Sequence, residues 1–132
     1  MFLNILRHKQ KILFMHLAIK AAEVNGIVEI TEKNMLKSYG AEMGITPFYS
    51  SECEVEVILQ EIKELSTQRE LRIILFEILG VLISDKDYDI AEKEFTERVR
   101  NAFGISKERC DNMWDILNEY SSICQKITDI VL

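Results

Sequence analysis

Apolar residues recur at intervals of three and four along almost the whole chain, and strong helix formers fill the positions between them. This spacing gathers the apolar side chains on one side of a helix, so the pattern predicts an all-α chain. Asn25-Gly26 and Gly44 with Pro47 are typical helix ends. Six helices are expected, over about residues 3–24, 31–43, 51–65, 67–83, 90–103 and 107–132.

Local signals refine this picture. Ser51 with Glu54 and Thr67 with Glu70 fit the capping box, which predicts the start of the third and of the fourth helix. The fourth helix is apolar on most sides, so it should be central. Residues 54–57 alternate like a strand and Asn25-Gly26 favours a hairpin, but neither signal has a partner strand in the sequence.

The last predicted helix carries one long apolar face. We interpret this face as a core seam, because a free cysteine behaves as a small apolar residue; a metal or redox role for its cysteines is the alternative. The three cysteines of the chain form no CxxC pair, and the odd number favours a reducing compartment. The residues of the face are Cys110, Met113, Leu117, Tyr120, Cys124 and Ile127.

An offset of sixty residues aligns the chain with itself. Between residues 30 and 46 this register gives five identities in seventeen pairs, and Gly44-Ile45-Thr46 matches Gly104-Ile105-Ser106. The match predicts two helix-corner-helix-turn-helix units, over about residues 3–65 and 67–132. Neither unit buries its apolar face alone, so the two are expected to pack with approximate twofold symmetry into one domain spanning residues 1–132.

The connection between the first two helices of each unit, which we call its corner, spans residues 25–32 in the first unit and 85–92 in the second. The two corners share a pattern, in which Asp or Asn is followed three residues later by an apolar residue and four residues after that by Glu. Here the sequence resembles the TerB-like family, an all-helical domain of two such repeats named for tellurite-resistance operons. The same domain is found in a DnaJ-type membrane co-chaperone. The residues that fall on the family signature are Asn25, Gly26, Val28 and Glu32 in the first unit and Asp85, Tyr88 and Glu92 in the second.

The resemblance implies a stress-response module that acts with other proteins. The sequence departs from the family pattern at Asn25, where the signature has an acidic residue, and at Lys86, where it has glycine. These departures weaken any function that needs acidic residues in both corners.

Oxygen ligands gathered in a short loop suit a hard divalent cation such as Ca²⁺ or Mg²⁺. The second corner is not an EF-hand, because Ile90 replaces the loop glycine and Thr96 replaces the bidentate glutamate. The remaining hypothesis is a divalent-cation site that has fewer protein ligands than an EF-hand and binds its cation weakly. Its candidate ligands are Asp85, Asp87, Asp89 and Glu92 in the second corner and Asn25, Glu29 and Glu32 in the first.

Helix capping is the alternative for most of these residues. Asp89 with Glu92 fits a capping box, and Thr31 is placed to cap the second helix. Asp85 and Asp87 are harder to explain as caps, because a carboxylate at a helix C-terminus meets the negative end of the dipole. The second corner is therefore the stronger candidate site.

The charge and hydrophobicity of the chain argue against nucleic-acid binding and against a membrane-spanning segment. The chain has 16 basic and 22 acidic residues and a net charge of −6, and its sequence contains no basic stripe. This charge argues against nucleic-acid binding, which begins with the neutralisation of phosphates. Its longest charge-free apolar run, Ile12–Ile19, is too short to span a membrane. No cleavage site follows that run, so we expect a cytoplasmic protein that keeps its N-terminus.

Catalytic motifs are missing from the sequence. Its histidines, His8 and His16, lie eight residues apart on one helix, and neither belongs to an ExxH or HExxH motif. We therefore expect no enzyme and no bound cofactor apart from the possible cation. The alternative to a cation module is an interaction or homodimerisation module, in which Phe2, Leu3 and Leu6, or the apolar residues 130–132, pack on a partner.

Overall fold

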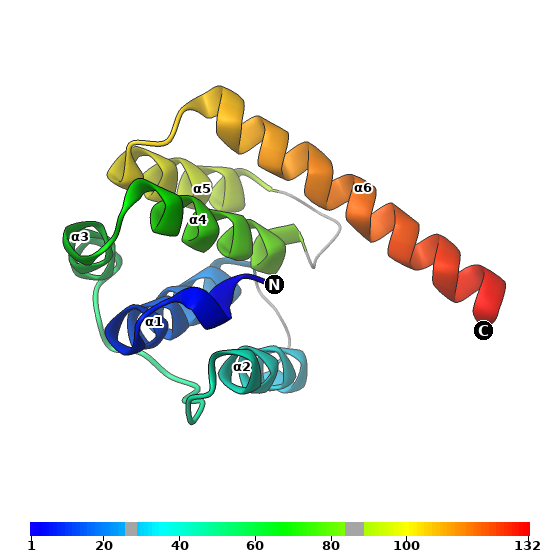
Figure 1. Ribbon diagram of the computed structural model, residues 1–132, viewed down its shortest axis with the longest axis horizontal. Helices are drawn as coiled ribbons and strands as arrows, with labels where there is room; N and C mark the ends of the chain where they lie inside the picture. The colour runs from blue at the N-terminus through cyan, green and yellow to red at the C-terminus, as the bar shows by residue number, and fades with distance from the viewer. Residues whose placement is uncertain (26–28, 84–88) are drawn as a thin grey trace.

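The computed structural model describes residues 1–25, 29–83 and 89–132, and every regular element in these ranges is a helix (Figure 1). The all-α prediction is therefore confirmed. The elements are a short 3-10 helix η1 (Leu3–Ile5) and the α-helices α1 (His8–Asn25), α2 (Glu29–Met43), α3 (Val55–Leu65), α4 (Gln68–Ile83), α5 (Ile90–Phe103) and α6 (Lys107–Val131).

Helices α1 and α4 form the centre of the molecule. Helix α1 packs on α2, α3, α4 and α5, and α4 packs on α1, α5, α6 and η1. Phe14 and Leu17 of α1 and Ile74 and Ile78 of α4 are fully buried. The prediction that α4 is central is confirmed, and the physical reason is that its apolar residues occupy most of its circumference.

The start of α4 is a complete capping box. The backbone N–H of Thr67 donates to Glu70 Oε1 at 2.8 Å, and the backbone N–H of Glu70 donates to Thr67 Oγ1 at 3.3 Å. These bonds satisfy N–H groups that have no partner inside the helix. The predicted start at Thr67 is confirmed.

Helix α1 begins later than the sequence pattern predicts. Leu6 has an extended backbone between η1 and α1, and the N–H of Arg7 donates to Gln10 Oε1 at 2.8 Å. The side chain of Gln10 thus caps the helix from within its first turn. Since Leu3 and Leu6 are both buried, the periodic pattern is kept although the helix is interrupted.

Helix α3 begins at Val55, so the predicted start at Ser51 is wrong. Ser51 Oγ lies 2.7 Å from His16 Nδ1 and accepts a hydrogen bond from the N–H of Cys53 at 3.3 Å. The hydroxyl is therefore engaged with α1 and with its own turn. Glu54 stands at the N-cap without a side-chain hydrogen bond to the helix.

Glycines in a left-handed conformation follow α2 and α5. Gly44 has φ 69° and Gly104 has φ 67°. Residues other than glycine rarely adopt this left-handed backbone conformation. It ends a helix, because the last carbonyls of the helix then accept hydrogen bonds from the chain that follows. At the second position, the N–H of Ile105 donates back to the carbonyl of Arg100 at 3.1 Å.

Helix α6 leaves the body of the molecule. Its first turns lie against α4, and the rest extends away from the other helices (Figure 1). Cys110 is its buried residue, Met113, Trp114 and Leu117 are half-buried, and residues 118–132 are exposed.

Candidate functional site

The second corner uses its described carboxylates to begin α5. Asp89 is the N-cap, and its Oδ1 accepts from the N–H of Glu92 at 2.9 Å. Glu92 Oε1 accepts from the N–H of Asp89 at 3.4 Å, and the side chain of Glu92 is buried. The capping interpretation of these two residues is confirmed.

The first corner holds two central helices together. Asn25 is the last residue of α1 and is buried, and its Nδ2 donates to the carbonyl of Val81 in α4 at 3.3 Å. Helix α2 begins at Glu29, so Thr31 lies inside its first turn and the prediction that Thr31 caps this helix is wrong. Glu32 is half-buried in the same turn, where a negative charge meets the positive end of the helix dipole.

Three of the seven candidate cation ligands are not described by the structure. Asp85 and Asp87 are not among the described residues, and the side chain of Glu29 is not described. Within residues 1–25, 29–83 and 89–132, no three His, Cys, Asp or Glu side chains form a group that could hold a metal ion. Binding of Ca²⁺ or Mg²⁺ at the corners stays a prediction.

The cysteines differ in their exposure, and His16 contacts the segment that leads into α3. Cys53 and Cys124 are exposed, whereas Cys110 is buried and its burial raises the pKa of the thiol. A raised pKa keeps the thiol protonated and poorly reactive. His16 contacts Ser51 and lies 4.7 Å from the ring of Phe48, measured between ring centroids, so it has a structural position beside α3.

The exposure of the apolar face of α6 is the point at which the structure differs most from the sequence interpretation. The predicted core seam is buried or half-buried at Cys110, Met113 and Leu117, but Tyr120, Cys124 and Ile127 are exposed. The seam prediction is therefore wrong for the second half of the helix. We call the whole apolar face the α6 stripe, and it consists of Met113, Ile116, Leu117, Tyr120, Ile123, Cys124, Ile127, Ile130 and Val131.

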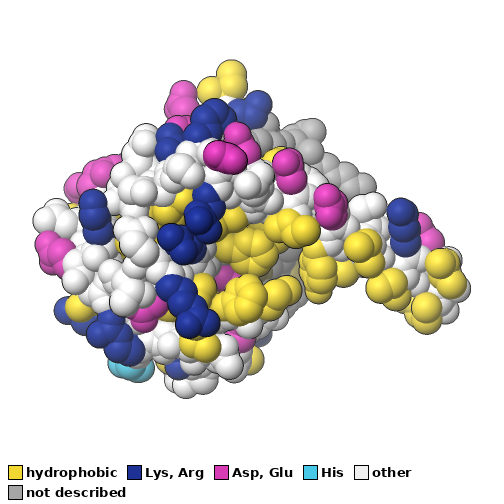
Figure 2. Space-filling view, turned by 45° about the horizontal axis from the view of Figure 1, so that its top comes forward, with side chains coloured by type: hydrophobic (Ala, Val, Ile, Leu, Met, Phe, Trp, Pro, Cys, Tyr) yellow, Lys and Arg dark blue, Asp and Glu magenta, His cyan; other side chains and the backbone are white. Residues whose placement is uncertain are grey.

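The stripe continues onto the body of the molecule. Figure 2 shows hydrophobic side chains running along α6 and meeting a second apolar group on the body. At the junction lies an open hollow of about 360 Å³, which we call the basal hollow. Its lining residues are Met1, Phe2, Phe76, Glu77, Gly80, Ile116, Leu117 and Tyr120.

Contacts with α4 hold the N-terminal segment at this hollow. The Met1 amino group lies 2.7 Å from Glu77 Oε1, and the N–H of Phe2 donates to the same oxygen at 3.0 Å. The rings of Phe2 and Phe76 are 6.2 Å apart, measured between centroids. Leu3 and Leu6 are buried in the chain's own core, so the prediction that they pack on a partner is wrong, while Phe2 is exposed.

Basic residues border the same apolar surface. Arg69, Arg72 and Arg109 line a smaller hollow of about 240 Å³ together with Phe2, Phe76 and Met113. An apolar centre with a charged rim is the usual anatomy of a protein interface. The apolar part exceeds the scattered hydrophobic residues found on ordinary surfaces, because it runs without interruption from the body to the end of α6.

Comparison of the chain with family models, curated protein sequences and solved structures finds no match. The resemblance to the TerB-like family therefore rests on the motif residues alone. Among the described residues, no helix combines the length and the apolar character needed to cross a membrane.

The sequence contained a signal for the α6 stripe. Its residues keep a seven-residue repeat from Met113 to Ile130, and a repeat of this kind is typical of a helix that packs along another helix. The pattern shows that the face is apolar but not what covers it. Residues 130–132 are exposed, and their packing on a partner stays a prediction. Ile123 and Ile127 extend the same exposed surface toward the body.

Proposed function

We propose that the chain is a protein-interaction module whose docking surface is the α6 stripe together with the basal hollow. The observation that carries this proposal is the exposure of the second half of α6. Ile116, Tyr120, Ile123 and Ile127 are each more than half exposed, and Ile130 is 84% exposed. A helix with one continuous apolar face is stabilised mainly by burying that face, and here the chain itself leaves it uncovered.

The polar composition of the remaining α6 surface supports the same function. Glu119, Lys126 and Asp129 lie beside or opposite the stripe and are exposed, so the helix presents an apolar face and a polar surface that carries charges. A surface helix of this kind is a common docking element, because a partner gains the hydrophobic free energy of the apolar face without unfolding the body. We therefore place the interaction on α6 rather than on the acidic corners.

Site-specific photo-crosslinking tests the proposal in the organism that makes the protein. A photoactivatable residue replaces Ile127 in one variant and Ile30 in a matched control, since both positions are exposed on helices. We expect a covalent adduct of higher mass at position 127, suppressed when Ile123→Glu is added, and none at position 30. Absence of any adduct at 127, or an adduct that survives Ile123→Glu, would exclude α6 as the docking surface.

We also propose that the two halves of the chain are TerB-like repeats, with the interaction module serving a stress-response complex. Several bounds support the sixty-residue offset. Helix α1 begins at His8 and α4 at Gln68, and α2 and α5 both end just before a left-handed glycine, Gly44 and Gly104 respectively. In this alignment α3 and α6 occupy equivalent positions, but α6 has 25 residues and α3 has 11.

A further inference from the structure

We propose that the partner of the α6 stripe is a second copy of this chain, with the two α6 helices antiparallel around a twofold axis. This inference rests on the proposed function, because it names the occupant of the same surface. It follows from the register of the stripe, from the charges beside it, from the area it exposes and from the position of the basal hollow.

The stripe is complementary to itself when the helices run in opposite directions. Its central residues alternate in steps of three and four, as the a and d positions of a heptad do. In an antiparallel pair each a position faces a d position of the other helix. With the twofold axis between Ser121 and Ser122, the facing pairs are Met113 with the partner's Ile130, Ile116 with the partner's Ile127, and Tyr120 with the partner's Ile123.

Each of these pairs occurs twice, since a twofold interface repeats every contact. All of the facing residues except half-buried Met113 are more than half exposed in the single chain. The paired segment from Met113 to Ile130 is about 26 Å long. Leu117 and the partner's Cys124 face each other along one flank, so the apolar contact is broader than a narrow two-helix seam.

Charge on the other flank fits the antiparallel direction. Glu119 and Lys126 each precede an a position, and in this register Glu119 faces the partner's Lys126 on both sides of the axis. Both side chains are exposed in the single chain. In a parallel pair Glu119 would lie beside the partner's Cys124 instead, so the opposite charges favour the antiparallel arrangement.

The exposed area matches what a dimer of this kind buries. A compact monomer of 15.4 kDa exposes about 7,200 Å², whereas this chain exposes 7864 Å². The excess is about 700 Å². A standard protein interface buries about 800 Å² of each partner, so the excess is of the size that one such interface covers.

The basal hollow receives the end of the partner's helix. In the antiparallel register, the partner's Ile127 and Ile130 lie beside Met113 and Ile116. Ile116 also lines the basal hollow, together with Phe2 and Phe76. The partner's helix end thus meets an apolar depression instead of open solvent, and the two bodies lie at opposite ends of the helix pair.

Sedimentation velocity of the full chain over a range of micromolar concentrations tests the dimer. We expect a species of twice 15.4 kDa that dissociates on dilution. Ile123→Glu should weaken association at least about 100-fold, because it places a charge at the twofold axis on both helices. Ile30→Glu is the matched control, since Ile30 is exposed on α2, and it should leave association unchanged. Circular dichroism verifies that both variants fold.

Charge exchange tests the direction of the helices. Glu119→Lys alone should weaken the dimer about 3- to 10-fold by placing like charges opposite each other, and Lys126→Glu alone should act in the same way. The double variant Glu119→Lys/Lys126→Glu should recover the wild-type affinity. A dimer that is indifferent to these changes would overturn the antiparallel register.

Self-association and the broader proposal fail in different ways. A wild-type chain that stays monomeric at every concentration overturns the second copy as partner. If photo-crosslinking at position 127 then yields an adduct with a different protein, the interaction module stands and only the identity of its partner is wrong. If the monomeric chain yields no adduct, both proposals are wrong.

Discussion

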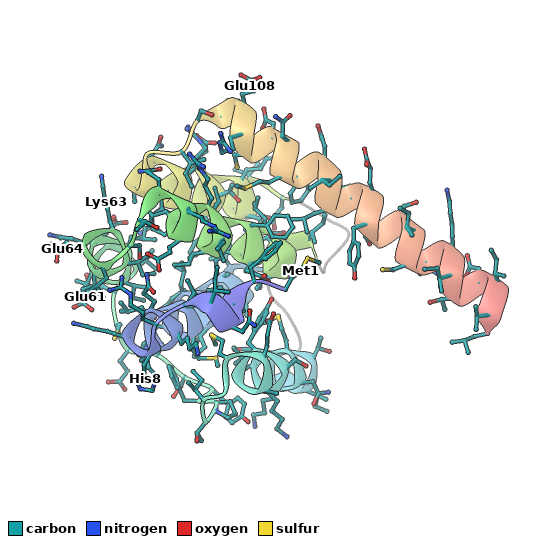
Figure 3. The ribbon with its side chains drawn as sticks, in the orientation of Figure 1. Met1, His8, Glu61, Lys63, Glu64 and Glu108 are labelled. Carbon is teal, nitrogen blue, oxygen red and sulfur yellow. The ribbon has the colours of Figure 1, made fainter. Side chains whose placement is uncertain are left out.

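Helices α3 and α6 carry the same kind of apolar face but place it differently. Helix α3 packs on α1 and α5, and its residues Ile58, Leu59 and Ile62 are buried. Glu61, Lys63 and Glu64 are exposed on its outer side (Figure 3). The corresponding apolar residues of α6 are buried only near its start. Beyond Leu117 the whole circumference of α6 is exposed.

Length explains this difference. Helix α3 has 11 residues and ends at Leu65, within the body, whereas α6 has 25 residues and extends about 37 Å. The body of the molecule covers only the first turns of α6. An amphipathic helix therefore identifies a face that needs burial, and the size of the body decides whether the chain itself provides it.

The largest expected effect contrasts the buried and exposed faces directly. Ile62→Ala in α3 should lower the free energy of unfolding by about 2–5 kcal/mol, because it removes fully buried atoms and leaves a cavity. Ile123→Ala in α6 should change it by no more than about 0.5 kcal/mol in the dilute chain. Urea denaturation at low protein concentration measures both.

Raising the concentration sharpens the same contrast. If α6 pairs with a second copy, the cost of Ile123→Ala should grow with protein concentration, since dimerisation stabilises the folded chain by mass action. The cost of Ile62→Ala should stay constant. Equal costs for the two substitutions in the dilute chain would mean that the second half of α6 packs on its own body.

Most of the helical architecture could be predicted from local signals. The Thr67–Glu70 and Asp89–Glu92 capping boxes are formed as predicted, because the relevant side chains and backbone groups lie within one turn. Ser51 failed as a cap because its hydroxyl lies against His16, thirty-five residues earlier in the chain. A tertiary contact of this kind leaves no mark on the local pattern.

The candidate site was harder to predict for the same reason. Apolar residues at positions 120, 124 and 127 look alike in the sequence whether a helix is covered or projects into solvent. Only the arrangement of α4 and η1 shows that the body ends near Leu117. The sequence favours the acidic corners as the candidate site, but two of their residues, Asp89 and Glu92, form the capping box of α5.

The N-cap residues of α3 and α6 also differ, and we expect their substitution to change the free energy of unfolding by an intermediate amount. Ser106 Oγ accepts from the N–H of Arg109 at 3.2 Å at the start of α6, so Ser106→Ala should lower the free energy of unfolding by about 1 kcal/mol. Glu54 makes no such bond at the start of α3, and Glu54→Ala should have little effect. Thermal unfolding followed by circular dichroism compares the variants, and a larger loss for Glu54→Ala would contradict the assigned caps.

Removing the projecting half of α6 should have a smaller effect on the body. A chain that ends after Asn118 loses only exposed residues, so the unfolding free energy of the dilute protein should change by no more than about 0.5 kcal/mol. Its helical content should fall and its self-association should disappear. Aggregation or unfolding of the shortened chain would instead show that the projecting half supports the core.

The smallest effect concerns the segment that leads into α3, which α1 holds through side chains. His16 Nδ1 lies 2.7 Å from Ser51 Oγ, and Lys20 Nζ donates to the carbonyl of Ser51 at 2.9 Å. Burial is the main cause that lowers the pKa of His16 below its usual 6.5; the charge of Lys20 acts in the same direction and that of Glu61 opposes it. The unfolded chain therefore binds this proton more readily than the folded chain does.

Stability that depends on neutral His16 is thus fully present above pH 6.5 and is lost as the pH falls from 6.5 through the lower pKa of the folded chain. His16→Gln should remove this loss, and in the wild type the resonances of residues near Ser51 should shift with acidification before those of α6 do. NMR titration above the range in which carboxylates titrate measures both. A wild-type stability that stays flat below pH 6.5, or equal shifts in α6, would show that His16 does not couple α1 to the start of α3.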